Sequence, residues 1–420
     1  ALARKLGVQE KTMAAAVVSG SCDANGYGGG KPSLQSWLMR KFLDHSSTSR
    51  SSSARECYCA VAVGNEAGDL DTIVSALGLA YLSSHTGMYV VGTTTAGRDR
   101  GGIVVPLIPF PRGEFRLRRD AVFLFKLAGF ALDPATEAPP ALLFSDDDAK
   151  RILPVEVCAA KTDSSVSNTP AALPMILLTD HNKRTFEHPL LNVDSAVVAI
   201  VDHHVDSGDH ADVRGAQRNI VSGLGSACTL VAELLIDAHA QGKCPLPEDL
   251  SLLLLATIVL DSRNWNPTRG TQRDKATFDR LLAIHPSLSR HFNVDDVYSQ
   301  VSAARQDVSM LNFDDLLKLD YKNCDFGKFR AGIPSIMSTL RTIVAEGADQ
   351  LQSLSNLSEL SVRTMWASLE RFRAQQSLDV VIGFTKKCPV DGTKHVLISA
   401  GIAWYNIDAG MVRSLAQYLI

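Results

Sequence analysis

Continuous apolar runs that end close to an aspartate are the main constraint on how this chain folds. The runs cover residues 57–63, 173–178, 196–201 and 252–260, and the aspartates that follow them are Asp69 and Asp71, Asp180, Asp202 and Asp261. Runs of Val, Ile and Leu without polar alternation are typical of parallel strands buried on both faces, and ligands of such sheets gather at the carboxyl ends of the strands. Carboxylates repeated at that edge predict a shared site for divalent cations.

The order of elements predicts an α/β fold, with a mostly parallel open sheet and helices on both faces. Strands are expected at 57–63, 88–92, 103–108, 173–178 and 196–201, and helices at 70–83, 226–240, 249–260 and 272–284. The last of the four apolar runs is helix-like, so Asp261 is expected to follow a helix. Strands that alternate with helices indicate parallel βαβ units.

Three regions are expected along the chain. Residues 1–55 are a Ser- and Gly-rich leader, partly disordered, around one short helix at 34–43. Residues 56–290 form the metal-binding catalytic domain, with a polar surface excursion at 145–170, and residues 291–420 form a smaller α+β domain. In that second domain, strands are expected at 313–321, 329–336, 378–385 and 395–404, and helices at 338–351 and 360–375.

Charge and cysteine usage narrow the functional classes. A net charge of −3 over 420 residues provides no polybasic field, so neither nucleic acid nor a membrane is expected as a partner. No segment reaches the roughly 18 uninterrupted apolar residues that a membrane helix needs. The eight scattered cysteines suggest reduced, buried thiols rather than disulfides or a zinc site, which favours a cytoplasmic location. The sequence leaves the oligomeric state open, with a monomer as the preferred expectation.

The segment Asp202-His203-His204 is the most informative part of the expected metal site. Adjacent histidines after a buried strand point in different directions, so one can bind metal while the other faces substrate. Taken singly, Asp69 has an alternative role as a helix N-cap, Asp180 as a turn residue and Asp261 as a helix cap. Their recurrence at the ends of apolar elements favours the metal-site interpretation.

The ligand types also indicate the metal. Oxygen-rich sites with a single imidazole suit Mn²⁺ or Mg²⁺, whereas zinc usually takes more His or Cys ligands. Two such divalent cations close together lower the pKa of a bridging water and neutralise phosphoryl oxygens. The expected chemistry is therefore in-line attack of metal-activated water on phosphorus.

Motifs that occur in a fixed order connect these residues to a known family. They are Gly64-Asn65-Glu66, Asp69-Leu70-Asp71, Leu117-Arg118-Arg119-Asp120, Asp180-His181-Asn182, Asp202-His203-His204, Gly225-Ser226-Ala227-Cys228, Leu260-Asp261-Ser262 and Asp320-Tyr321-Lys322. In these motifs the chain resembles the DHH phosphoesterase superfamily over residues 57–405. It is most similar to the eukaryotic exopolyphosphatase branch, which is related to family II inorganic pyrophosphatases and prune proteins.

The resemblance implies a two-metal site. The first metal would be bound by Asp69 and Asp180 with Asn65 beside it, and the second by Asp71, Asp180, His203 and Asp261. His181, next to the bridging Asp180, is expected near the metals. His204 would hydrogen bond the attacked phosphate, as an imidazolium or as a general acid.

The resemblance also implies residues that hold the substrate. Lys322, in the second domain, would reach the phosphate chain, and with His204 and Asp180 it completes the expected catalytic set. Arg118 and Arg119 are candidates for the same phosphate-binding task. Their alternative is a solvated basic patch shared with Arg112 and Arg116.

Two positions separate the branches of the superfamily. Pyrophosphatases resemble this motif but carry histidine at the position of Asn65, and an amide oxygen is a poorer transition-metal ligand than imidazole. Prune proteins typically carry arginine at the position of His204. Both positions favour an exopolyphosphatase that releases terminal orthophosphate from linear inorganic polyphosphate, with Mg²⁺ or Mn²⁺ as cofactor.

The carboxyl end departs from the family pattern. Relatives end with a basic Arg-Lys segment that helps bind substrate, whereas Arg413 is the last basic residue before Ile420. We expect either a truncated chain or a member that manages without that segment.

The alternatives are an inorganic pyrophosphatase, a prune-like phosphodiesterase and a non-catalytic interaction protein on the same fold. The last of these would be favoured by loss of a metal carboxylate, and the sequence retains all of them.

Overall fold

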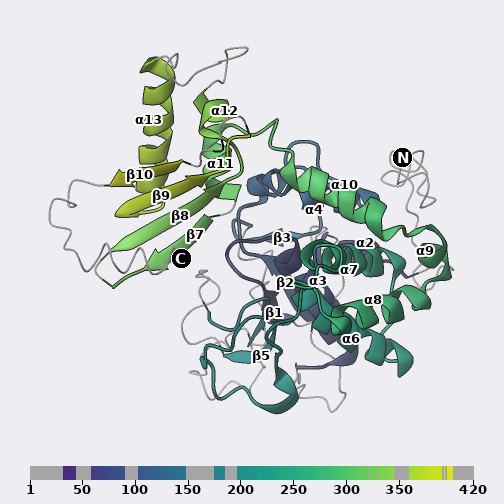
Figure 1. The fold of residues 1–420 in the computed structure, drawn as a ribbon. Coiled ribbons are helices and arrows are strands. Elements are labelled where there is room, and N and C mark those ends of the chain that lie inside the picture. Colours follow the sequence, from purple (N-terminus) through teal and green to yellow (C-terminus); the bar gives the residue numbers. More distant parts are fainter. Residues whose placement is uncertain are drawn as a thin grey trace, which may run out of the picture. The chain divides into compact units, whose positions relative to one another are not determined.

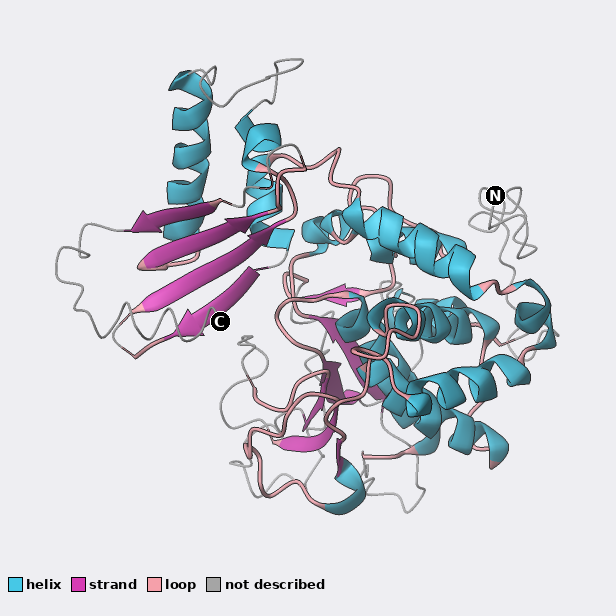
Figure 2. Cartoon of the chain, in the orientation of Figure 1, coloured by secondary structure: helices cyan, strands magenta, loops and turns pink. Residues whose placement is uncertain are grey.

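The computed structural model describes residues 32–43, 58–89, 103–147, 175–184, 196–319, 321–327, 329–344, 359–389, 392 and 395–400. The chain divides into two compact units, Ala1–Arg305 and Gln306–Ile420. Figure 1 labels their helices and strands, and Figure 2 colours them by type. The division falls after the expected boundary at 290/291, because helix α10 (Val294–Gln306) belongs almost entirely to the first unit.

The first unit is built on a six-stranded sheet in which all neighbours are parallel. The order is β3 (Leu143–Phe144), β2 (Ile103–Ile108), β1 (Tyr58–Val63), β4 (Met175–Thr179), β5 (Val197–Asp202) and β6 (Arg218–Ile220). Residues 60–63 and 103–108 are buried throughout, which explains their unbroken apolar sequence. The predicted α/β class with a second, smaller sheet domain is confirmed.

Helices pack against this sheet and against one another (Figure 1). Helix α3 (Leu70–Thr86) contacts β1, β2 and β4, and α6 (Ala227–Ala240) contacts β5. Helix α7 (Glu248–Asp261) packs on α3, α6 and α8 (Gln272–Ile284). Because α7 is surrounded in this way, its residues 250–260 are all buried, and their apolar run resembles that of a buried strand. Three of the four apolar runs are therefore strands and the fourth is a helix.

Several short helices of the first unit were not expected from the sequence. They are η4 (Arg112–Leu117), α4 (Arg119–Leu127), α9 (Pro286–His291) and α10. In α10, Val297 and Val301 are buried four residues apart, as on one face of a helix. This helical spacing lies close to the expected domain boundary, and for that reason no helix was predicted there.

The second unit contains a four-stranded sheet in the order β10 (Val396–Ala400), β9 (Val380–Thr385), β8 (Arg330–Ile336), β7 (Tyr321–Asp325). Only the β8–β9 pair is parallel within this described sheet. Helices α11 (Phe313–Leu319) and α13 (Glu359–Gln375) pack against it, and α12 (Leu340–Val344) contacts α13. Strands β8, β9 and β10 and helix α13 confirm predicted elements.

The strand predicted at 313–321 is wrong, because residues 313–319 form helix α11. The Asn312 side chain accepts a hydrogen bond from the Asp315 amide (2.9 Å), and the Asp315 carboxylate accepts one from the Asn312 amide (3.3 Å). This reciprocal capping starts a helix and places Phe313, Leu316 and Leu317 on its buried face. The expected strand begins only at Tyr321.

Other predictions fall on parts of the chain outside the described residues. They concern most of the leader at 1–55, the strand at 88–92 beyond Tyr89, most of the excursion at 145–170, the end of the helix at 338–351, residues 401–404 and the carboxyl end at 401–420. In the residues that are described, no helix combines the length and apolar character needed to cross a membrane.

The short helix α2 (Leu34–Leu38), which continues as η2 (Met39–Leu43), confirms the helix predicted within the leader. Asp249, in the first turn of α7, holds its amino end. The Asp249 carboxylate accepts hydrogen bonds from Ser33 Oγ (2.8 Å) and from the amides of Leu34 (2.9 Å) and Gln35 (3.1 Å). Trp37 on the same helix packs edge-on against Tyr81 of α3 at 5.2 Å.

Replacing this carboxylate should loosen α2 selectively. We expect Asp249→Ala to cost about 1–2 kcal/mol, in the upper part of the range for a lost side-chain acceptor at a helix amino end, because three donors lose their partner. Amide hydrogen exchange at 34–38 should therefore accelerate by about 5- to 30-fold. The matched control is Asp237→Ala on α6, which removes only an exposed ion pair with Arg280. Equal exchange at 34–38 in the two variants would contradict this role for Asp249.

Candidate metal centre

The strand order of the first sheet defines where its ligand site lies. Strands β2 and β4 lie on opposite sides of β1. The chain therefore extends the sheet from β1 to β2 and β3 on one side, and from β4 to β5 and β6 on the other. Ligands of open α/β sheets bind at the carboxyl ends of the strands at such a point. Here β1 leads into residues 64–69, β4 into Asp180, and the adjacent β5 into His203.

The loop after β1 holds two of the predicted residues, Asn65 and Asp69. Asn65 Oδ1 accepts a hydrogen bond from the Ala67 amide (3.0 Å), and Asp69 Oδ1 caps α3 by accepting one from the Thr72 amide (3.0 Å). A Cβ at Gly64 would lie 2.3 Å from the Thr72 methyl group, so glycine is required for this close turn. The N-cap role of Asp69 and its place beside the site are therefore compatible.

Asp180 is at the centre of the cluster. It follows β4 with φ of 57°, a left-handed conformation that aspartate tolerates better than most residues. Its Oδ2 accepts hydrogen bonds from Asn65 Nδ2 (2.6 Å) and Thr72 Oγ1 (2.7 Å), while Oδ1 faces His203 Nε2 at 3.2 Å. Burial, and then the charge of Asp71, raise the pKa of Asp180 to about 7.

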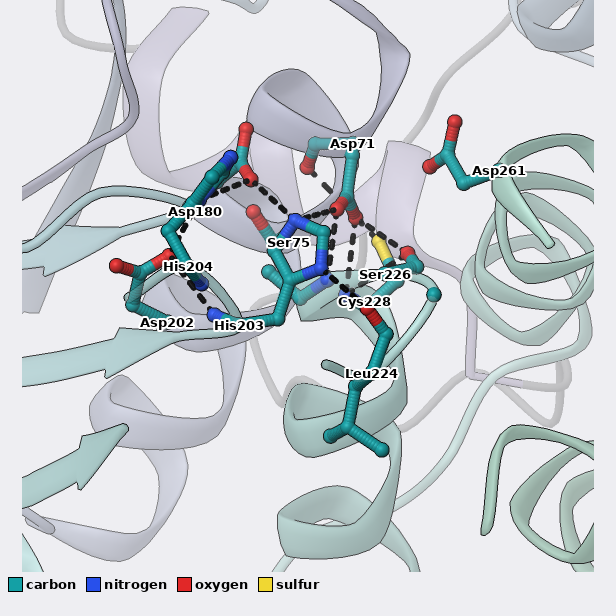
Figure 3. Close-up of polar contacts among 12 residues, drawn as sticks. Asp71, Ser75, Asp180, Asp202, His203, His204, Leu224, Ser226, Cys228 and Asp261 are labelled. Atoms are coloured by element: carbon teal, nitrogen blue, oxygen red, sulfur yellow. Dashed lines mark hydrogen bonds and ion pairs between the residues drawn. The ribbon is translucent and has the colours of Figure 1, made fainter. Parts of the chain in front are cut away.

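His203 is oriented with one nitrogen toward the carboxylates (Figure 3). Its Nδ1 donates to the Leu224 carbonyl oxygen (2.8 Å), which leaves Nε2 facing Asp180 and, at 3.7 Å, Asp71 Oδ2. Burial lowers the pKa of His203, but the hydrogen bond with Asp180 and the charge of Asp71 outweigh burial and raise it to about 10. A cation at this position would replace the Nε2 proton.

Asp71, in the first turn of α3, contacts the amino end of α6. Its carboxylate accepts hydrogen bonds from Ser226 Oγ (2.7 Å) and from the amides of Ala227 (2.7 Å) and Cys228 (2.9 Å). The amino end of a helix carries partial positive charge and stabilises an anion there. These three donors hold the Asp71 carboxylate in place and compensate its negative charge.

Asp261 closes α7 on the other side of Asp71 in the view of Figure 3. Among the described residues, its buried Oδ2 has no hydrogen-bond partner. Its Oδ1 lies 3.9 Å from Arg305, whose Nε in turn is 3.3 Å from buried Asp120. Burial, and then the charges of Asp71 and Asp69, raise the pKa of Asp261 well above its usual range.

His204 points outward from the same strand end, with its side chain 55% exposed. Its Nδ1 donates to Asp202 Oδ1 (2.9 Å), which fixes the ring and leaves Nε2 as the outward nitrogen. That hydrogen bond raises the pKa of His204. Asp202 is fully buried and also accepts hydrogen bonds from the His203 amide (2.8 Å) and from Asn182 Nδ2 (2.5 Å).

Of the first-unit residues expected to bind substrate, His204 lies at this cluster, whereas Arg118 and Arg119 contact other partners. Arg118 is buried and donates to backbone carbonyls of Ala67 and Gly68, and Arg119 pairs with Glu137 at 2.5 Å. Lys322 is exposed on β7 and is described only within the second unit. His181 donates through Nδ1 to the Thr179 carbonyl oxygen (2.8 Å), and burial lowers its pKa.

Three residues of the site were missed as functional residues. Thr72 and Ser226 each donate a hydroxyl hydrogen bond to a predicted ligand, and Asp202 orients His204. Ser226 and Asp202 lie in motifs already quoted, so their positions were signalled although their roles were not. Thr72 carries no such signal, because its contact with Asp180 joins residues 108 positions apart.

The residues of the cluster fit a divalent cation. One ligand atom from each of Asp180, His203 and His204 lies within 4.8 Å of the others. Asp71 also faces His203, and the buried Asp261 Oδ2 lacks a protein partner among the described residues. Because His204 Nδ1 is bonded to Asp202, His203 supplies the imidazole of the site, and carboxylate oxygens with one imidazole are the donor set of Mn²⁺ or Mg²⁺.

Comparison with known proteins identifies the family of this chain. Residues 60–258 match the DHH family, N-terminal domain, and residues 299–412 match the DHHA2 domain. The chain therefore belongs to the DHH phosphoesterase superfamily. Within this superfamily, the relatives support assignment of the chain to the branch of exopolyphosphatases and prune proteins.

Among the relatives is a putative exopolyphosphatase of Schizosaccharomyces pombe, 28% identical over 62% of this chain and 58% of that protein. The human exopolyphosphatase PRUNE1 is 26% identical over 77% of this chain and 59% of its own length. A manganese-dependent inorganic pyrophosphatase of Methanocaldococcus jannaschii is 27% identical over 38% of this chain and 51% of that protein. The chain thus spans little more than half of the length of these relatives.

Without metal, the stability of the first unit should fall as pH rises. Asp180 keeps a proton in the folded state up to about pH 7, whereas in the unfolded state it loses the proton near pH 4, so its contribution declines across that window. The imidazolium of His203 stabilises fully below about pH 6.5, and this stabilisation is lost as pH rises toward 10. Both groups act in the same direction.

We therefore expect the Tm in chelator to be lower at about pH 8 than at about pH 6, and Mg²⁺ to raise the Tm more at the higher pH, because cation binding releases protons. Differential scanning fluorimetry measures both effects. Asp180→Asn, which cannot titrate, should show a shallower decline. A Mg²⁺ effect on Tm that is the same at both pH values would contradict the assignment.

Proposed function

We propose that this chain is an exopolyphosphatase that hydrolyses terminal orthophosphate from linear inorganic polyphosphate with the help of two divalent cations. The observation that carries the proposal is the cluster of buried Asp71 and Asp180 with His203, which has the donor set of a cation site. The exopolyphosphatase names of the relatives support the substrate class.

The cations would be held as the family resemblance implies. One would lie by Asp69 and Asp180 with Asn65 beside it, and the other by Asp71, Asp180, His203 and Asp261. When bound, Mg²⁺ or Mn²⁺ would lower the pKa of a water ligand and offset phosphate charge. The hydrogen bonds to Asp71 and Asp180 orient these carboxylates before any cation arrives.

The outward nitrogen of His204 is the protein group that we assign to the reacting phosphate. Asp202 holds the ring through Nδ1, so Nε2 can donate a hydrogen bond to a phosphoryl oxygen. The hydrogen bond with Asp202 raises the pKa of His204 and so favours the protonated ring, which suits a donor to developing negative charge. Lys322 of the second unit is proposed to hold the phosphate chain.

Pyrophosphate is the second candidate substrate, because a manganese-dependent pyrophosphatase is among the relatives. Asn65 weighs against it. Its amide nitrogen donates to Asp180 and its oxygen accepts from the Ala67 amide, so the side chain supports a ligand rather than offering an imidazole of its own. A weaker first cation site follows, and it is more tolerant of Mg²⁺.

A cytoplasmic location is part of the proposal. Cys228, Cys244, Cys324 and Cys388 are all free and buried, which suits a reducing compartment.

Substrate preference tests the proposal directly. We expect phosphate release from long-chain polyphosphate and tripolyphosphate with Mg²⁺ or Mn²⁺, little release from pyrophosphate, and none with chelator. Asp180→Asn should reduce release by at least about 100-fold, as expected when a catalytic metal ligand is lost. Asp279→Asn, which changes an exposed carboxylate on α8, is the matched control. Faster release from pyrophosphate than from tripolyphosphate would favour the second candidate instead.

The residue at position 65 should tune that preference. Asn65→His supplies an imidazole to the first cation, so we expect pyrophosphate hydrolysis to rise relative to tripolyphosphate hydrolysis. Asn65→Ala removes the amide without adding a ligand and should not raise the ratio. Steady-state rates on both substrates measure it, and an unchanged ratio in Asn65→His would remove Asn65 as the reason for separating the two activities.

A further inference from the structure

Arg118 has an environment unlike that of a phosphate-binding arginine. It precedes α4, and only 6% of its side chain is exposed, although an arginine that contacts substrate must present its guanidinium to the solvent-filled site. The guanidinium lies over the Phe110 ring, with Cζ 3.9 Å from the ring centroid. The position of this charge therefore needs an explanation other than substrate binding.

Arg118 Nη1 donates to the Glu114 carbonyl oxygen (3.4 Å) and lies 3.8 Å from the Glu114 carboxylate, while two other hydrogen bonds of Arg118 reach the loop that precedes Asp69. Nη2 donates to the Ala67 carbonyl oxygen (3.0 Å) and Nε to the Gly68 carbonyl oxygen (3.4 Å). These two carbonyls belong to consecutive peptides, and the planar fork of a guanidinium can contact both. Without Arg118 these carbonyl oxygens would lose a charged donor, so Arg118 stabilises the loop in this conformation.

Gly68 and Phe110 complete the arrangement. Gly68 has φ of 59°, and a Cβ there would lie 2.3 Å from the Phe110 ring and 3.6 Å from Arg118 Nη2. The ring thus fills the space that the missing side chain leaves, and the guanidinium lies over the same ring. A cation over an aromatic face at a buried position contributes further attraction. Gly68, Phe110 and Arg118 form one packed unit behind Asp69.

The same loop determines the positions of two groups at the cation site. Asn65 donates to Asp180, and Asp69 follows Gly68 directly as the N-cap of α3. A shift of the Ala67 and Gly68 peptides would move the Asp69 carboxylate relative to Asp180, because Asp180 also has partners outside this loop, Thr72 and His203. The effect of Arg118 should therefore be confined mainly to the first cation.

We propose that Arg118 is a positioning residue that holds residues 65–69 so that Asp69 can bind the first cation, and that it does not bind phosphate. This inference rests on the proposed two-cation function. Residues that orient metal ligands typically contribute about 10- to 100-fold to metal affinity. Arg118 acts in this way from behind the loop.

The chain contains a matched control in Arg112. Its guanidinium also lies over a phenylalanine ring, 4.5 Å from the Phe144 centroid, and also bonds buried carbonyls, including that of Pro139 at 3.4 Å. It pairs with Asp147 at 2.7 Å, and none of these partners belongs to the loop before Asp69. Arg112→Ala therefore removes a comparable stacked arginine without touching the proposed site.

The test compares wild type, Arg118→Ala and Arg112→Ala in the full chain. Electron paramagnetic resonance of free Mn²⁺ gives the number and affinity of bound ions without any substrate. We expect two ions in wild type, about 10-fold weaker binding of one ion in Arg118→Ala, and wild-type affinity in Arg112→Ala. At saturating Mn²⁺, Arg118→Ala should recover kcat and keep the wild-type KM for tripolyphosphate.

The outcomes are distinguishable. Equal Mn²⁺ affinities in the two variants would overturn the role of Arg118. A raised KM with unchanged Mn²⁺ affinity would also overturn it and restore the phosphate-binding interpretation. Failure of wild type to bind Mn²⁺ or release phosphate would instead reject the proposed function. If Arg118→Ala does not fold, Arg118→Lys keeps the charge but loses the planar fork, and it should weaken one ion in the same direction; wild-type affinity there would overturn the inference.

Discussion

The convergence of buried carboxylates on one sheet edge is the constraint on which the first unit depends. Asp71 and Asp180 both face His203, and the charges of Asp69, Asp71 and Asp180 act on buried Asp261. Like charges removed from water repel strongly, so such a cluster persists only with compensation. The amino end of α6, the hydroxyls of Thr72 and Ser226 and the imidazolium of His203 provide part of it. A divalent cation would provide the remainder.

The architecture around the cluster follows from this requirement. The strand order places the ends of β1, β4 and β5 together, while α3 and α6 begin at the same edge and direct backbone amides toward it. Tight backbone features occur where elements enter the site, at Gly64, Gly68 and Asp180. In this arrangement the ligands are held by hydrogen bonds before a cation binds, and each support belongs to a different element of the fold.

Much of this arrangement could be predicted from the sequence, because buried parallel strands leave unbroken apolar runs and the carboxylates follow them. The cation-ligand assignments remain predictions, although the structure brings Asp71, Asp180 and His203 together. Arg118 could not be placed, because a charge pattern does not reveal that two carbonyls and the Phe110 ring surround it. Helix α11 was mistaken for a strand, since the reciprocal capping of Asn312 and Asp315 outweighs the apolar residues that suggested β structure.

The central claim is that this carboxylate cluster exists to hold two cations. Anomalous diffraction at the manganese absorption edge, from crystals of the full chain grown with Mn²⁺, tests it most directly. The account predicts two peaks bridged by the Asp180 carboxylate, one of them also bonded to His203 Nε2 and the other next to Asp69. Crystals that show His203 Nε2 still hydrogen bonded to Asp180, with manganese bound elsewhere or not at all, would contradict the account.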